Sequence, residues 1–161
     1  MRIYIKNKFF SLGGSSTAND VYGQPVYKIK GKPFSPTRKK KIKTLNGDTL
    51  YTVRNKFFNF FFHTAYIKDS EGNLIVKIRN AFSFKREYIV SGYTDDFTVS
   101  GDFFSLDLTV TRNGVPVGTI RRDFSIIKDA FILDSDEEDM AFLVAMVIAI
   151  DNIVDNQYGR S

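Results

Sequence analysis

The chain has 161 residues and carries 23 Lys and Arg against 18 Asp and Glu, for a net charge of +5, with no cysteine and a single histidine. Without cysteine, the chain can form no disulfide, zinc–thiolate site or thiol nucleophile, and a reducing compartment is expected. This length predicts one domain over residues 1–161, large enough to bury its own core.

The first 133 residues have the pattern of short strands. Apolar residues alternate with polar ones, and turns that contain glycine interrupt the alternation. A repeat underlies this pattern: a glycine is followed six residues later by an aliphatic residue, then by a basic residue and soon by phenylalanine, starting at Gly23, Gly47, Gly72 and Gly114. The pattern predicts twelve strands, over residues 2–9, 16–22, 25–33, 38–45, 48–57, 60–68, 73–82, 86–90, 96–102, 104–111, 115–123 and 126–133.

The turns between these strands favour antiparallel neighbours. Asn46-Gly47 and Asn113-Gly114 are strong signals for tight hairpins, so consecutive strands are expected to form a meander. A sheet of about twelve strands must curl, and closure removes the exposed edges that invite aggregation. The expected fold class is therefore mainly β, a barrel of antiparallel strands.

The end of the chain predicts a helix that fills this barrel. Met140 to Ile150 is a run of eleven residues without a polar side chain. Ser135 and Glu138 precede it with the spacing of a capping box, which predicts one helix over about 136–155. Because the run has no polar stripe, the helix must be surrounded. A membrane span needs about 20 apolar residues, so a protein core is the expected surrounding.

Three stretches resemble the LURP-one-related family. They are Gly23–Lys32 (Gly-Gln-Pro-Val-Tyr-Lys-Ile-Lys-Gly-Lys), Phe97–Phe103 (Phe-Thr-Val-Ser-Gly-Asp-Phe) and Gly118–Ser125 (Gly-Thr-Ile-Arg-Arg-Asp-Phe-Ser), the last leading into the acidic run and the apolar helix. The resemblance covers nearly the whole chain. It implies the architecture shared with the tubby C-terminal domain and the phospholipid scramblases, a twelve-stranded barrel around a central C-terminal helix.

The most informative pattern for function is basic. Residues 1–60 carry a net charge of +11 and residues 61–161 a net charge of −6. A hairpin that bends at residues 34–37 would pair lysines with lysines on the outer face, and the next hairpin would bring Arg54 opposite position 39. The candidate anion-binding residues, which we call the basic face, are Lys28, Lys30, Lys32, Lys39, Lys41, Lys43, Arg54 and Lys56.

A partner for the basic face follows from its charge. Like charges that oppose each other destabilise a sheet, and a bound anion would relieve the repulsion. Tubby domains bind phosphoinositides and scramblases act on lipids, so the resemblance implies an anionic membrane surface or phosphoinositide as the partner. The alternatives are a solvated surface that prevents aggregation and a nucleic acid; nucleic acid ranks lower because no recognition motif accompanies the cations.

An aromatic run lies beside the basic face. Residues 57–62 contain five phenylalanines, which alternation cannot bury together, so Phe58, Phe60 and Phe61 are candidate contacts to a membrane or a protein partner. The alternative is a barrel corner covered by neighbouring residues, and a structural or protein-interaction barrel remains a second hypothesis for the whole chain.

The sequence offers no constellation typical of an enzyme. The acidic run lacks the Gly and Glu positions of a calcium-binding EF-hand loop, and His63 has no obvious nucleophile beside it. We therefore expect a non-enzymatic protein with no metal and no cofactor. The first residues lack the apolar core of a signal peptide, which predicts a cytoplasmic protein, peripheral to a membrane if the lipid hypothesis holds.

Overall fold

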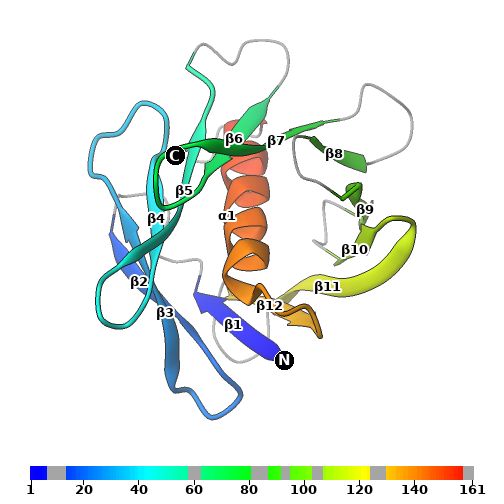
Figure 1. Ribbon diagram of the computed structural model, residues 1–161, viewed down its shortest axis with the longest axis horizontal. Coiled ribbons are helices and arrows are strands. Elements are labelled where there is room, and N and C mark those ends of the chain that lie inside the picture. Colours follow the sequence, from blue (N-terminus) through cyan, green and yellow to red (C-terminus); the bar gives the residue numbers. More distant parts are fainter. Residues whose placement is uncertain are drawn as a thin grey trace.

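Twelve strands and one helix make up the described part of the chain (Figure 1). The computed structural model describes residues 1–6, 14–57, 63–80, 87–91, 95–102, 107–123 and 130–157. The strands are β1 (Arg2–Lys6), β2 (Ser15–Asn19), β3 (Pro25–Gly31), β4 (Lys40–Lys43), β5 (Thr49–Asn55), β6 (Thr64–Lys68), β7 (Leu74–Asn80), β8 (Glu87–Ser91), β9 (Phe97–Asp102), β10 (Asp107–Arg112), β11 (Val115–Asp123) and β12 (Ala130–Ser135), and the helix is α1 (Met140–Gln157).

The strands form a closed antiparallel barrel. Each strand pairs with the next in the chain, and β1 closes the sheet by pairing with β12 as well as with β2. Across this closing pair, Ile3 lies opposite Leu133, and both side chains are fully buried. The predicted fold class, about twelve antiparallel strands around a C-terminal helix, is confirmed.

Several strands are shorter than predicted because turns begin earlier. The strand predicted over 16–22 ends at Asn19, since the Asp20 carboxylate accepts hydrogen bonds from the amides of Tyr22 and Gln24, both at 2.9 Å. The strand predicted over 38–45 is reduced to Lys40–Lys43. In both cases the side chains and amides at the strand end bond within a turn instead of across the sheet.

The two Asn-Gly pairs form different turns. Asn113 and Gly114 are the only residues between β10 and β11, and both have positive φ, 51° and 80°, as a type I′ turn requires. The Asn46-Gly47 pair lies in a longer connection, closed by a 2.9 Å hydrogen bond from the Thr44 amide to the Asp48 carbonyl. Asn113-Gly114 therefore forms the tight hairpin that was predicted, whereas Asn46-Gly47 lies in a wider turn.

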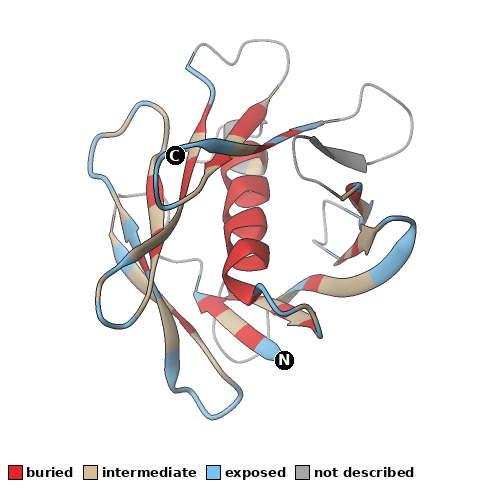
Figure 2. Ribbon diagram, in the orientation of Figure 1, coloured by how far each residue is buried: buried red, intermediate tan, exposed pale blue. Residues whose placement is uncertain are grey.

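The core is the contact between the inward strand faces and α1. Every residue from Met140 to Ile150 is buried, and Figure 2 shows this helix enclosed by the strands. It packs mainly on β5 and β6, and less on β12 and β4. Near the helix start, the Phe142 ring meets the edges of Tyr51 and Phe97, with ring centroids 5.9 and 5.7 Å apart. The apolar run is therefore the centre of the protein.

The helix begins four residues later than predicted, at Met140 rather than 136, and ends at Gln157 rather than 155. Ser135 and Glu138 do not form the predicted capping box. Ser135 is the last residue of β12, and its hydroxyl donates to the Val117 carbonyl at 2.6 Å. Asp139 caps the helix instead, because its carboxylate accepts a 2.9 Å hydrogen bond from the Phe142 amide.

A buried polar cluster holds the second half of α1 to β4 and β5. The Lys40 side chain is only 3% exposed, and its Nζ donates to Asn152 Oδ1 at 2.7 Å. Asn152 also donates to the Arg38 carbonyl, and Asn55 Nδ2 donates to the Asn152 carbonyl, both at 3.2 Å. These bonds fix the position of the helix along the barrel, which apolar contacts alone specify poorly.

We expect Val147→Asp to abolish folding. Val147 is buried in α1, and an unpaired carboxylate there costs several kcal/mol against a typical total stability of about 5–15 kcal/mol. Thermal melting followed by circular dichroism tests this, with Val115→Asp at the exposed first residue of β11 as the control. A cooperative melt of Val147→Asp close to that of the wild type would contradict a buried helix.

We expect Lys40→Ala to lower the free energy of unfolding by about 2–3 kcal/mol, because it leaves the buried Asn152 amide oxygen without its charged donor. Lys41→Ala, the same substitution one residue away on the outer face, should change stability by less than about 0.5 kcal/mol. Urea unfolding of both variants measures the difference. Equal urea midpoints for the two variants would show that the buried polar cluster contributes little to stability.

Candidate anion-binding face

Strands β3 and β4 carry the centre of the basic face. Their register pairs Lys28 with Lys43 and Lys30 with Lys41, as predicted from the hairpin. Between them, Ile29 faces Ile42, and both isoleucines are buried against the core. Because side chains alternate along a strand, the four lysines lie on the outer surface.

The remaining members of the face lie toward one end of these strands. Lys32 is joined to Lys39 by a 3.0 Å hydrogen bond from its amide to the Lys39 carbonyl. The β4–β5 register ends at Lys40 opposite Val53, so Lys39 and Arg54 follow directly beyond it. The Arg54 guanidinium lies 5.2 Å from the centre of the Tyr66 ring on β6, a cation–π contact, and Lys56 is exposed.

The described residues provide no carboxylate partner for these eight cations. The ion pairs of the described chain lie elsewhere: Arg2 with Asp134, Arg112 with Asp95 and Glu137, and the N-terminal amine with Asp136. Two lysines bond to main-chain carbonyls instead, Lys28 Nζ to Leu45 at 2.7 Å and Lys43 Nζ to Gly47 at 3.0 Å. Each ammonium retains further donors for an anion.

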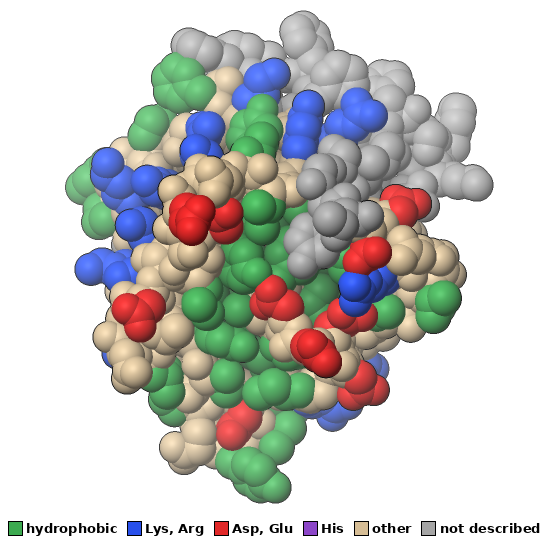
Figure 3. Space-filling view, viewed as in Figure 1, with side chains coloured by type: hydrophobic (Ala, Val, Ile, Leu, Met, Phe, Trp, Pro, Cys, Tyr) green, Lys and Arg blue, Asp and Glu red, His purple; other side chains and the backbone are tan. Residues whose placement is uncertain are grey.

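The basic face extends onto strands that the sequence analysis did not include. Lys41 and Lys68 lie on either side of Thr52 across β4, β5 and β6. On β7, Lys77 lies opposite Tyr66 of β6, and on β1, Lys6 is exposed. Strand alternation applied to β1, β6 and β7 would have identified these cations. Figure 3 shows basic side chains along the left and upper parts of the molecule, while acidic side chains lie at the left, near the centre and at the lower right.

Two surface grooves lie among the lysines. One, of about 540 Å³, is lined by Lys6, Lys28, Lys30 and Lys43 together with the residues Ser15, Ser16 and Thr17 of β2. The other, of about 350 Å³, is bounded by Lys30, Lys32, Lys39, Lys41 and Lys43. The two share Lys30 and Lys43. Ammonium groups around a hollow that also offers hydroxyl groups are suited to phosphate.

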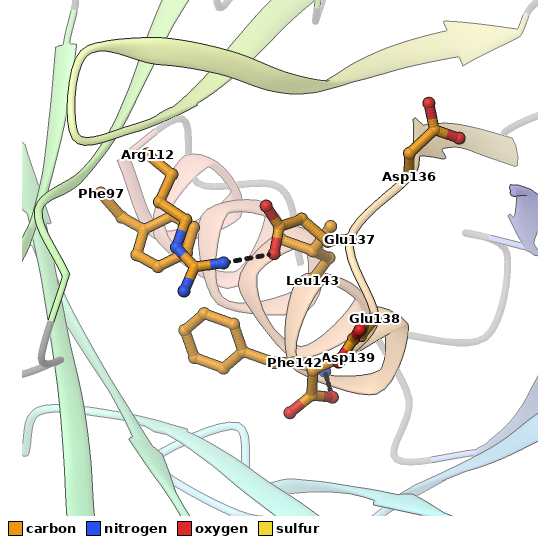
Figure 4. A pocket seen from close by; sticks show the side chains of 8 residues that line it. All are labelled: Phe97, Arg112, Asp136, Glu137, Glu138, Asp139, Phe142 and Leu143. Carbon is orange, nitrogen blue, oxygen red and sulfur yellow. Dashed lines mark hydrogen bonds and ion pairs between the residues drawn. The ribbon is translucent and has the colours of Figure 1, made fainter.

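A third pocket, of about 420 Å³, lies where α1 begins (Figure 4). Arg112 points into it between Phe97 and Glu137, and its Nη1 lies 2.8 Å from the Glu137 carboxylate. Hydrogen bonds from Asn113 and Arg112 lower the pKa of Asp95 below its ordinary value. Two carboxylates of this pocket have a structural role, since Glu137 binds Arg112 and Asp139 caps the helix.

The other candidates from the sequence are the aromatic run and His63. Phe58, Phe60 and Phe61 lie outside the described residues, whereas their neighbour Phe57 is 52% exposed. Burial lowers the pKa of His63, so this histidine is neutral near pH 7 and adds no charge to the basic face. Among the described residues, no three His, Asp or Glu side chains are grouped as metal ligands.

In the described part of the chain, no helix combines the length and the apolar character that crossing a membrane requires.

Comparisons with known proteins agree with the fold. The model of the LURP-one-related family matches residues 1–151. The crystal structure of a protein from Arabidopsis thaliana superposes with a TM-score of 0.65 at 18% sequence identity, over 95% of this chain and 90% of that one. No curated protein matches the chain. At this identity the structural likeness establishes the shared fold only.

We expect Lys41→Glu to raise the free energy of unfolding by about 0.5 kcal/mol, because it replaces a repulsive cross-strand pair with Lys30 by an attractive one. Lys41→Ala serves as the comparison, because it removes the repulsion with Lys30 without adding an attraction, so the gain in stability should be smaller. Urea unfolding at low salt measures both variants. A loss of stability in Lys41→Glu would mean that the facing lysines do not repel each other.

Proposed function

We propose that this chain, which belongs to the LURP-one-related family, is a non-enzymatic module that binds anionic lipid headgroups through its basic face. The single observation that carries the proposal is the pairing of Lys28 with Lys43 and of Lys30 with Lys41 without a carboxylate between them. Such pairs lower the stability of the free protein, and a bound anion removes that cost.

The breadth of the face favours a surface as the ligand. Outward cations continue from Lys6 on β1 through β3, β4 and β5 to Lys68 on β6, which is wider than a small anion could cover. Each Lys or Arg close to an anionic membrane contributes about 1 kcal/mol, so several acting together give stable peripheral binding. The two grooves among the lysines could each receive a phosphorylated headgroup of the phosphoinositide kind.

Other functions have less support. The described residues contain no group of metal ligands, and the sequence has no motif of a nucleophile with its base, which is why the proposal is a binding module rather than an enzyme. A nucleic acid would meet the same cations, but α1 is buried and cannot serve as a recognition helix. A protein-interaction role remains the alternative if no lipid binds.

Vesicle co-sedimentation tests the proposal. The wild type should bind vesicles of phosphatidylcholine mixed with phosphatidylserine or with a phosphatidylinositol bisphosphate, and should not bind phosphatidylcholine alone. Lys30→Glu combined with Lys41→Glu should weaken binding at least about thirtyfold, because two attractive charges become repulsive. Added salt should weaken the wild-type interaction as well.

Matched controls separate position from net charge. Lys30→Glu and Arg121→Glu each change the charge by the same amount, and Arg121 is exposed on β11, which β2, β1 and β12 separate from β3 in the closed barrel. Equal losses from both variants, or no wild-type binding at modest salt, would refute the proposal. Binding to duplex or single-stranded DNA in a gel shift, without binding to vesicles, would show that the ligand of the basic face is nucleic acid and not lipid.

A further inference from the structure

The antiparallel meander sends alternate connections to opposite ends of the barrel. Connections 7–14, 32–39, 56–63, 81–86, 103–106 and 124–129 join strands at one end, which we call the phenylalanine end. Connections 20–24, 44–48, 69–73, 92–96, 113–114 and 136–139 join strands at the other end, which we call the acidic end. This assignment follows from the strand directions alone.

The two sets of connections differ sharply in sequence. Those of the phenylalanine end contain thirteen of the 16 phenylalanines and eight Lys or Arg against one Asp. Those of the acidic end contain ten Asp or Glu and neither phenylalanine nor a basic residue. The three other phenylalanines, Phe97, Phe131 and Phe142, are buried in the barrel. Of the thirteen phenylalanines in these connections, the structure describes Phe34 and Phe57.

Two described phenylalanines show what this end presents to solvent. Phe34 is fully exposed at the turn between β3 and β4, and its φ of 55° is a left-handed conformation that non-glycine residues avoid. Phe57, just after β5, is 52% exposed. A 2.7 Å hydrogen bond from the amide of Asn55, the last residue of β5, to the Thr37 carbonyl joins the end of β5 to the connection 32–39, so both phenylalanines lie near neighbouring strand ends at the same end of the barrel.

An exposed lysine lies close in the sequence to each of these phenylalanines. Lys32 and Lys56 are exposed within two residues of Phe34 and Phe57, and both lysines also belong to the basic face. The basic face and the phenylalanine end are therefore continuous. An apolar ring flanked by ammonium groups suits the boundary of an anionic bilayer, where the ring leaves water and the charges meet phosphate.

We propose that the phenylalanine end is the end of the barrel that faces the membrane, with Phe34 and Phe57 entering the interfacial layer of an anionic bilayer. Lys32 and Lys56 contact the headgroups beside them. The acidic end points away, because its carboxylates are repelled by the negative surface. This inference rests on the proposed lipid binding. It adds the orientation of the barrel on the membrane and an apolar contact between the protein and the bilayer.

The lack of tryptophan in the natural sequence makes a direct test possible. Phe34→Trp and Phe57→Trp each create a single fluorescent reporter at the phenylalanine end. Tyr22→Trp creates a matched reporter at the acidic end, where Tyr22 is 85% exposed. Each full-length variant is titrated with vesicles of equal parts phosphatidylcholine and phosphatidylserine, with and without brominated acyl chains.

We expect the emission of Phe34→Trp and Phe57→Trp to shift to shorter wavelength and to be quenched by the brominated chains, and the emission of Tyr22→Trp to stay unchanged. Unchanged emission at positions 34 and 57 while the protein co-sediments would overturn the inference and leave lipid binding by charge intact. An emission shift of Tyr22→Trp instead would overturn the inference, because it would show that the acidic end faces the membrane. A shift that depends on protein concentration alone would assign this end to contacts between copies.

Affinity provides a second readout. Phe34→Ser combined with Phe57→Ser should weaken vesicle binding about tenfold or more, because the two rings that would be partly buried in the bilayer are lost. Val115→Ser at the acidic end should leave it unchanged. Unaltered affinity of the double variant would overturn the apolar contact, whereas the absence of wild-type binding would overturn the proposed function itself.

Discussion

The structure depends on one constraint, the enclosure of a helix that has no polar side. Every residue of α1 from Met140 to Ile150 is buried, so apolar surface must approach it from all directions. A closed sheet meets that demand, because each strand turns alternate side chains inward and pairs its main chain with two neighbours. The same alternation obliges the other half of the side chains to face outward, where lysines are tolerated.

Much of the fold follows from local patterns. Strand alternation and turn residues predicted the twelve strands, and the turn at residues 34–37 determined the pairing of Lys28 with Lys43. The predicted start of the helix was wrong because both Ser135 and Asp139 are residues that can cap a helix. The choice between them depends on the contact of Ser135 with the distant Met1. Ser135 remains in β12, where its amide donates to the Met1 carbonyl at 3.0 Å.

The candidate site was predictable only in part, for physical reasons. Alternation places Lys40 inward, but its partner Asn152 lies 112 residues away, and no local pattern connects the two. Lys6 and Lys68 join the basic face because barrel closure and strand order bring β1 and β6 beside the central strands. Cations that were distributed along the sequence thus become one surface through tertiary structure.

The order of elements along the chain has a consequence for synthesis. Residues 140–157 follow all twelve strands, so a growing chain presents the inward faces of the sheet before their apolar centre exists. The closing pair of β1 with β12 also joins residues more than a hundred positions apart. Long-range closure of this kind is slow, and open strands with apolar faces are prone to aggregate. We therefore expect a nascent chain to be most prone to aggregation in the interval before α1 has been synthesised.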